Sequence, residues 1–217
     1  MFQPVIKWSG SKRTQSLELV KLSPKFKTYY EPFLGGGSML YPLNDKLNSA
    51  ICGDICKPLI ELWLLIQQNP QRLVDSYKKN WERLQKGGYK IYYEIRDRFN
   101  SKQNPEDLFF LSRTCVNGLI RFNKGGKFNN SLHHTRKGIN PERVKDIIFD
   151  WSKQIKNVKF VHGDYKKTTE KATSEDFLYL DPPYFNTKGR YFGTIDYELF
   201  LSFLEDFSDS LVLIFRS

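Results

Sequence analysis

The stretch Phe177–Tyr184, with the sequence FLYLDPPY, constrains the fold of this chain more than any other. Four apolar residues with an aromatic among them are typical of a short buried strand. Pro182 and Pro183 end that strand, because proline cannot donate to a sheet and holds its φ near one value. Asp181 thus stands in a stiff turn at a strand's carboxyl end, where open α/β sheets place their ligands. We interpret the turn as functional; an ordinary proline turn with an incidental acid is the alternative.

A run of three glycines, Gly35, Gly36 and Gly37, follows a β-rich stretch and precedes a segment that could open a helix. Glycines permit positive φ and let a ligand approach the backbone closely, and amides at a helix start suit a carboxylate. No Gly-Lys-Ser/Thr follows, so a nucleotide P-loop is not supported. Because the acid Glu31 stands four residues before the run, we interpret it as a cofactor loop, with a simple tight turn as the alternative.

Two more short strands are predicted to end in acids, at Asp54 and at Asp164. In dinucleotide-binding folds an acid beyond the glycine loop accepts hydrogen bonds from ribose hydroxyls, and Asp54 suits that role. Asp is also a good helix N-cap, so Asp54 could start the helix that follows. A further helix, capped by Asp196, and a last strand over residues 211–215 complete the predicted α/β pattern.

Residues 58 to about 154 have a different pattern. Apolar residues recur there at helical spacing among many lysines and arginines. Asn69-Pro70, Gly87-Gly88 and Asn104-Pro105 are predicted breaks between helices. The sequence therefore predicts a helical module, residues 58–157, inserted into an α/β domain formed by residues 1–57 and 158–217.

Within the helical module, residues 117–129 predict a hairpin whose turn is the sequence KGGK. Lysines and arginines are dense here and in residues 130–145, which suits contacts to phosphates. An aromatic residue at a hairpin tip, here Phe122, could wedge into a space that a base has left. The alternative is a solvated basic hairpin with a buried phenylalanine.

The composition agrees with a folded protein that binds a polyanion. The chain has 217 residues, a net charge of +10 and 15% aromatic residues, which favours a globular protein with nucleic acid as partner. No apolar run is long enough to span a bilayer, and the first residues do not begin a signal peptide. The three cysteines lack metal-ligand spacing, so we expect reduced thiols, a cytoplasmic location and no metal.

Asp181-Pro182-Pro183-Tyr184 resembles the catalytic motif of amino-group DNA methyltransferases. The order of the other motifs resembles the Dam-like N6-adenine branch, which is bacterial or phage-encoded. The resemblance implies a Rossmann-like methyltransferase sheet with an inserted target-recognition domain. It also implies S-adenosyl-L-methionine as cofactor and double-stranded DNA as partner, with the target base flipped out of the duplex.

The resemblance also assigns roles to individual residues. Catalytic roles fall on Asp181, Pro182, Pro183 and Tyr184. Cofactor contacts fall on Trp8, Lys12, Glu31, Phe33, Gly35, Gly36, Gly37, Asp54, Asp164 and Asp181. DNA contacts fall on Lys7, Arg121, Phe122, Asn123 and Lys124.

The implied chemistry needs no metal. If Asp181 and the Pro182 carbonyl accept the hydrogens of adenine N6, electron density returns to that nitrogen, which can then attack a sulfonium methyl group. Tyr184 would stack on the extruded base. Methylation at cytosine N4 uses similar chemistry and is a close rival, whereas C5 methylation would need a Pro-Cys nucleophile that the chain lacks.

The resembled proteins continue past a strand such as 211–215 for a further hairpin and helix. We therefore expect C-terminal strands of the sheet to be missing, which would expose an apolar edge. We expect a monomer, or a chain whose sheet a partner completes. A catalytically silent, shortened relative that still binds DNA is the contrasting hypothesis.

Overall fold

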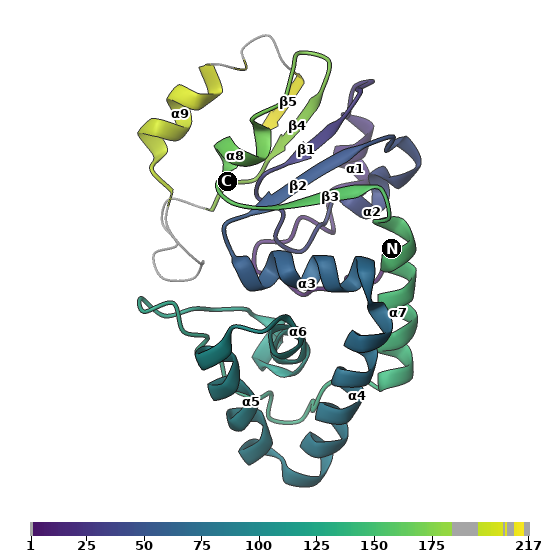
Figure 1. Ribbon diagram of the computed structural model, residues 1–217, viewed down its shortest axis with the longest axis vertical. Coiled ribbons are helices and arrows are strands. Elements are labelled where there is room, and N and C mark those ends of the chain that lie inside the picture. The colour runs from purple at the N-terminus through teal and green to yellow at the C-terminus, as the bar shows by residue number, and fades with distance from the viewer. Residues whose placement is uncertain (1, 184–194, 206, 208–210, 215–217) are drawn as a thin grey trace.

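The computed structural model describes residues 2–183, 195–205, 207 and 211–214 (Figure 1). The strands are β1 (Tyr29–Glu31), β2 (Ala50–Asp54), β3 (Val158–His162), β4 (Phe177–Leu180) and β5 (Leu211–Ile214). The α-helices are α1 (Ser16–Lys21), α2 (Leu40–Leu43), α3 (Lys57–Gln68), α4 (Pro70–Gly87), α5 (Tyr89–Lys102), α6 (Pro105–Thr114), α7 (Pro141–Gln154), α8 (Tyr165–Thr169) and α9 (Tyr197–Glu205). Two 3₁₀ turns, η1 (Asn44–Lys46) and η2 (Val116–Gly118), complete the described elements.

The described strands form one parallel sheet in the order β3-β2-β1-β4-β5. From β1 the chain builds outward through β2 and β3, then returns to place β4 on the other side of β1. The strand order therefore reverses between β1 and β4, and a crevice opens at such a switch point beyond the carboxyl ends of the strands. Tyr30 lies level with Leu178 in this pair, so the glycine run and Asp181 both follow the strand ends at that crevice.

The two faces of the sheet carry alternate residues of β1 and β4, as expected for a sheet buried on both sides. Tyr29, Phe177 and Tyr179 belong to the buried cluster that α2, α3 and α7 share. Tyr30 and Leu178 belong to a second cluster with residues of α9. The predicted α/β sheet is confirmed, and the structure places helices on both of its faces.

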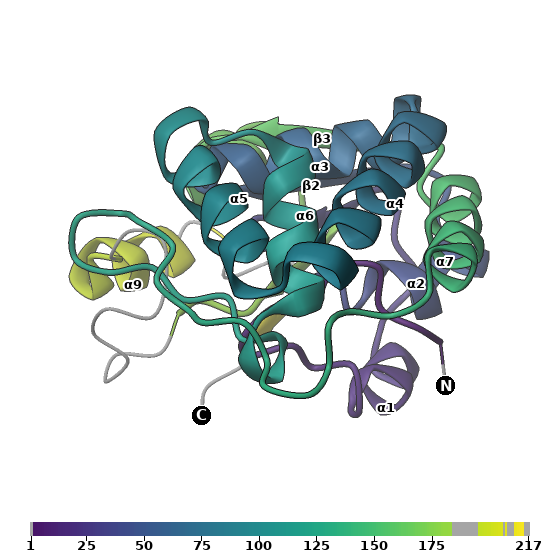
Figure 2. The same ribbon diagram turned by 90° about the horizontal axis from the view of Figure 1, so that it is seen from below.

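Helices α4, α5 and α6 lie beyond α3, on the side away from the sheet, and α7 runs alongside (Figures 1 and 2). The three predicted breaks are confirmed. Asn69 and Asn104 each cap the following helix by accepting a backbone N–H, with proline in the first helical position. Gly88 has a φ of 53°, which suits glycine and separates α4 from α5.

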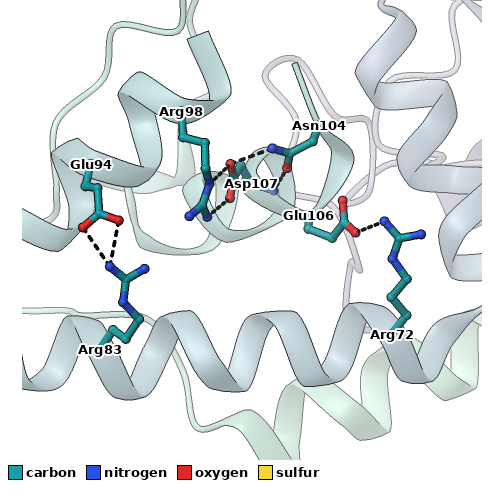
Figure 3. Close-up of polar contacts among 7 residues, drawn as sticks. All are labelled: Arg72, Arg83, Glu94, Arg98, Asn104, Glu106 and Asp107. Carbon is teal, nitrogen blue, oxygen red and sulfur yellow. Dashed lines mark hydrogen bonds and ion pairs between the residues drawn. The ribbon is translucent and has the colours of Figure 1, made fainter. Parts of the chain in front are cut away.

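Ion pairs join the three helices to one another (Figure 3). Asp107, 1% exposed, accepts hydrogen bonds from the Arg98 guanidinium at 2.7 and 2.5 Å and from the Asn104 amide at 2.8 Å. Arg83 and Glu94 pair at 2.7 Å on the surface between α4 and α5. The Asp107 cluster therefore ties α5 to the start of α6 from within.

The predicted boundary near residue 58 stays a prediction. Helix α3 contacts β2 and β3 on one side and α4 and α6 on the other. The buried cluster next to the sheet also continues into α4, α5 and α6 without a break. Helix α3 thus belongs to the layer that covers the sheet as much as to the helical block.

Replacing Asp107 by Ala is expected to lower the free energy of unfolding by about 2 kcal/mol, because it removes several hydrogen bonds to a charged group. Glu94→Ala breaks an exposed pair and is expected to cost less than about 1 kcal/mol. Urea denaturation of both variants measures the difference. Equal effects would show that the Asp107 cluster does not stabilise the helical block.

Candidate functional site

A cavity of about 330 Å³ lies at the switch point between β1 and β4. It is lined by residues 8–12, 31–36, 38, 54–55, 163–165, 181–183 and 195–196. Segments far apart in the sequence thus meet at one place, because each follows the carboxyl end of a strand or packs against one.

The glycine loop lies directly against Trp8. A Cβ atom on Gly35 would lie 2.6 Å from Trp8 Cδ1, and one on Gly36 would lie 3.1 Å from Trp8 Cβ. Gly35 also has a φ of 49°. Gly35 therefore requires glycine for its backbone conformation and for close approach, and at Gly36 a side chain would fit only if Trp8 or the Ile6 backbone shifted slightly.

Gly37 has a different role from the other two glycines. A Cβ atom there would lie 2.9 Å from the Trp63 ring, and Gly37 is not among the residues that line the cavity. The predicted contact of Gly37 with the cofactor stays a prediction. Its lack of a side chain lets the loop pack on Trp63, whose Nε1 donates to the Gly35 carbonyl at 3.1 Å.

Asp54 fixes the other side of the glycine loop. Its carboxylate accepts hydrogen bonds from Gly35 N at 3.0 Å and from Cys56 N at 2.9 Å. Burial raises the pKa of Asp54 to about 6, against the opposing effect of these hydrogen bonds. The N-cap of α3 is Cys56, so the alternative role of Asp54 as a helix N-cap is not found.

Glu31 ends β1 at the floor of the cavity and is 2% exposed. The Tyr29 hydroxyl donates a hydrogen bond to its carboxylate at 2.9 Å. Burial raises the pKa of Glu31 well above its ordinary value. Glu31 is therefore a deeply buried acid among those that line the cavity.

Asp181, at the end of β4, is paired with Lys12. Lys12 Nζ donates to both oxygens of the carboxylate, at 2.7 and 2.9 Å, and the two side chains are only 8% and 18% exposed. Burial raises the pKa of Asp181, and the neighbouring lysine opposes the rise. Lys12 therefore determines how this carboxylate is oriented.

The remaining predicted residues of the α/β part are also brought to the cavity. Asp164 lines it and caps α8 by accepting a hydrogen bond from Lys167 N at 2.9 Å. Phe33 lines it with its ring 5.8 Å from that of Tyr165. Pro182 and Pro183 line it as well, and Tyr184 lies outside the described residues.

The basic hairpin, which we define as residues 119–130, projects from α6 on the same side of the molecule as α9 (Figures 1 and 2). An antiparallel bridge pairs Phe122 with Phe128. Asn123 accepts hydrogen bonds from Gly125 N and Lys127 N, both at 3.0 Å, and so shapes the turn. The predicted hairpin is confirmed.

The predicted role of Phe122 as an exposed wedge is corrected, and the alternative of a buried phenylalanine is found. It is 1% exposed, and its ring packs 6.4 Å from that of Phe99 and 6.1 Å from that of Phe128. Alternate residues of an extended strand point to opposite sides, so Arg121 and Asn123 are exposed while Phe122 points inward. An exposed aromatic wedge at this position is not what the structure shows.

Two asparagines outside the predicted set hold the basic hairpin in place. Asn100 of α5 donates to Phe128 O at 3.1 Å and accepts from Phe128 N at 2.8 Å. Asn130 donates to Val116 O and Leu119 O, at 3.0 and 2.8 Å. Sequence reasoning missed both because an asparagine carries no periodic signal that shows which distant backbone it will pair with.

Lys7 lies at the base of the basic hairpin. Its side chain is exposed at the surface, yet a Cβ atom on Gly118 would come within 2.5 Å of Lys7 Cδ. Partial burial lowers the pKa of Lys7, and the charge of Arg113 lowers it further. Lys7, Arg121 and Lys124 are thus basic groups on or beside one hairpin.

Within the described residues, no cluster of His, Cys, Asp or Glu could hold a metal ion. Cys52, Cys56 and Cys115 are buried and free. No helix that the structure describes is long and apolar enough to cross a membrane.

A parallel sheet in this order, with a glycine loop after β1 and acids at the ends of β1, β2 and β4, defines a Rossmann-like methyltransferase fold. Residues 8–207 match the model of the D12 class N6 adenine-specific DNA methyltransferases. The chain belongs to this family.

Several curated proteins are similar to it. The Type II methyltransferase M.MjaIII of Methanocaldococcus jannaschii is 32% identical over 203 residues, which covers 84% of this chain and 69% of that protein. The Type II methyltransferase M1.LlaDCHI of Lactococcus lactis subsp. cremoris is 29% identical, with 84% and 66% covered. The DNA adenine methylase of Escherichia coli K12 is 28% identical, with 82% and 64% covered. The chain thus spans about two thirds of the length of these relatives.

The raised pKa of Asp54 predicts a pH dependence of stability. Its folded-state pKa, about 6, exceeds the ordinary value of 3.8, so between these values the folded protein keeps a proton that the unfolded chain has released. The free energy of unfolding therefore falls as pH rises through this window. The side chain of the Asp54→Asn variant does not titrate, so its free energy of unfolding should not fall in this window. Relative to the natural protein, the variant should therefore be more stable at about pH 7 than it is at about pH 4.

Urea unfolding of the natural protein and of Asp54→Asn at about pH 4 and about pH 7 measures the change in their stability difference. A difference between the proteins that does not change with pH would contradict the raised pKa, since any hydrogen bond lost in the variant acts equally at both.

Proposed function

We propose that this protein transfers a methyl group from S-adenosyl-L-methionine to adenine N6 in double-stranded DNA, after flipping the base out of the duplex. One observation carries the proposal: the glycine loop and Asp181, far apart in the sequence, line the same cavity. Family membership supports adenine N6 in DNA as the target.

The residues of the cavity fit the proposed cofactor. S-adenosyl-L-methionine would bring a sulfonium-bound methyl group, which is electrophilic, together with a ribose and an adenine. Asp54 has the position and the carboxylate to accept hydrogen bonds from ribose hydroxyls. Gly35, Gly36, Trp8, Asp164 and Phe33 line the same cavity. The backbone of the two glycines and Trp8 would contact the amino-acid part of the cofactor, and Asp164 and Phe33 would contact its adenine.

The charges of the cavity also suit a cation. Acids at positions 31, 54, 164, 181 and 196 line it, and Lys12 is the cation among the described lining residues, where it is paired with Asp181. A positively charged sulfonium is favoured in such surroundings. The net charge of +10 is therefore carried elsewhere, where it suits DNA.

Asp181 and the Pro182 carbonyl would accept the two hydrogens of the target amine. These fixed acceptors favour the charge that develops as the nitrogen attacks. The family resemblance implies a cofactor contact by Lys12, and its hydrogen bonds to Asp181 also support a role in orienting the catalytic acid.

The basic hairpin, with Lys7 beside it, is the proposed DNA contact. Arg121, Asn123 and Lys124 are exposed on it, and residues 58–157 would form the target-recognition part. Basic side chains there would anchor the duplex through its phosphates. Phe122 is not part of this proposal, because it is buried.

Transfer of a labelled methyl group from S-adenosyl-L-methionine to duplex DNA tests the proposal, and digestion to nucleosides identifies the methylated base. Asp181→Asn should lower the rate at least about 100-fold, because the amide cannot accept in place of both carboxylate oxygens. Cofactor and DNA binding should remain. Asp45→Asn, at an exposed acid outside the cavity, is the control and should keep full activity.

Three results would contradict the proposal in different ways. Near-normal turnover by Asp181→Asn would show that this acid has no catalytic role. DNA binding without any transfer by the natural protein would favour a silent DNA-binding relative. Label recovered in N4-methylcytosine would change the target base.

Lys12→Met should move the acid limb of the rate–pH profile to higher pH. Lys12 opposes the rise in the pKa of Asp181 that burial causes, so its loss raises that pKa further and protonates the acid at a higher pH. Lys57→Met, at a side chain 68% exposed, is the matched control. An acid limb that stays in place in Lys12→Met would show that Asp181 does not set it.

A further inference from the structure

We propose that Ser9 is a positioning residue that links DNA contact by the basic hairpin to the orientation of Asp181. The proposal rests on the proposed function, which makes the hairpin the DNA contact and Asp181 the catalytic acid. It concerns the segment of residues 7–12, which touches both of them.

The first half of this segment is attached to the hairpin. Ser9 Oγ donates a hydrogen bond to Ile120 O at 2.9 Å, between residues 111 positions apart in the sequence. Lys7 packs against Gly118 at the hairpin base. The preceding residues are held as well, since the Arg113 guanidinium of α6 donates to the carbonyls of Pro4 and Val5.

Other residues of the same segment are attached to the cavity. Trp8 covers the glycine loop, and Lys12 Nζ binds both oxygens of Asp181. Lys12 N also donates to Ser38 Oγ at 3.2 Å. Only Gly10 and Ser11 therefore separate Ser9, which is hydrogen-bonded to the hairpin, from Lys12, whose side chain orients the catalytic acid.

Side-chain hydrogen bonds hold the backbone of the basic hairpin at three places. Its backbone ladder is short, but asparagine side chains bind its backbone at the turn (Asn123), in the middle (Asn100) and at the base (Asn130). A force on the outer face of such a unit moves Ile120 with it. Ser9 is the polar side chain through which that movement reaches the segment.

Ser9→Ala is expected to lower kcat for DNA methylation about tenfold, the effect of one lost hydrogen bond of ordinary strength. The KM values for DNA and for the cofactor should stay within about twofold, since Ser9→Ala changes neither the basic groups nor the glycine loop. Ser9→Thr keeps a hydroxyl and should restore most of the rate. A general loss of structure would not lower kcat while leaving the KM values unchanged, and Ser9→Thr would not restore the rate.

A double-mutant cycle tests the route. Asn100→Ala loosens the hairpin on α5, so removing Ser9 in that background should cost clearly less than tenfold. Ser23→Ala removes a similar bond, from Ser23 Oγ to Val20 O at 2.7 Å, at a site away from the cavity, and should leave kcat unchanged. Fully additive losses for Ser9 and Asn100 would overturn the link.

Hydrogen exchange gives a readout that does not depend on catalysis. Duplex DNA should slow amide exchange over residues 8–12 in the natural protein and not in Ser9→Ala. Equal protection in both proteins would overturn the proposal, whether or not either is active. If the natural protein shows this protection but transfers no methyl group, the proposed function fails and the link stands.

Discussion

The reversal of strand order between β1 and β4 is the constraint on which the site depends. From β1 the chain continues to β2 and β3 on one side, whereas β4 continues to β5 on the other side. The connections thus diverge from the pair β1 and β4, and no crossover helix covers the carboxyl ends of these two strands. The glycine loop leaves β1 there and Asp181 leaves β4 there. A strand placed between β1 and β4 would separate the two motifs.

The protein also separates its charges. Acids 31, 54, 164, 181 and 196 line the cavity, whereas the chain as a whole is strongly basic. Burial raises the pKa values of Glu31, Asp54 and Asp181, and a cation bound nearby would favour their ionised forms. Lys12 is the exception, a buried lysine that is paired with Asp181. An acidic pocket inside a basic protein suits a cationic cofactor and a polyanionic substrate at neighbouring places.

Local patterns were enough to predict the strands, the helix breaks and most of the cavity, because the FLYLDPPY stretch, the glycine run and the Asn-Pro pairs each act through backbone chemistry. Contacts that depend on three-dimensional packing were not predictable. The basic pattern of the hairpin does not decide whether Phe122 is an exposed wedge or the buried alternative, and its strand places it inward. Nothing in the glycine run indicates that Gly37 packs against Trp63. The pairing of Lys12 with Asp181 joins positions 169 residues apart, and nothing local indicates it.

A crystal structure of the protein with S-adenosylhomocysteine and a duplex containing the target adenine tests the central claim most directly. We expect the cofactor product against Gly35 and Gly36 with its ribose at Asp54, and the flipped adenine with its N6 within hydrogen-bonding distance of Asp181. A cofactor product bound outside this cavity, or a target base that remains stacked in the duplex with Asp181 far from it, would contradict the account.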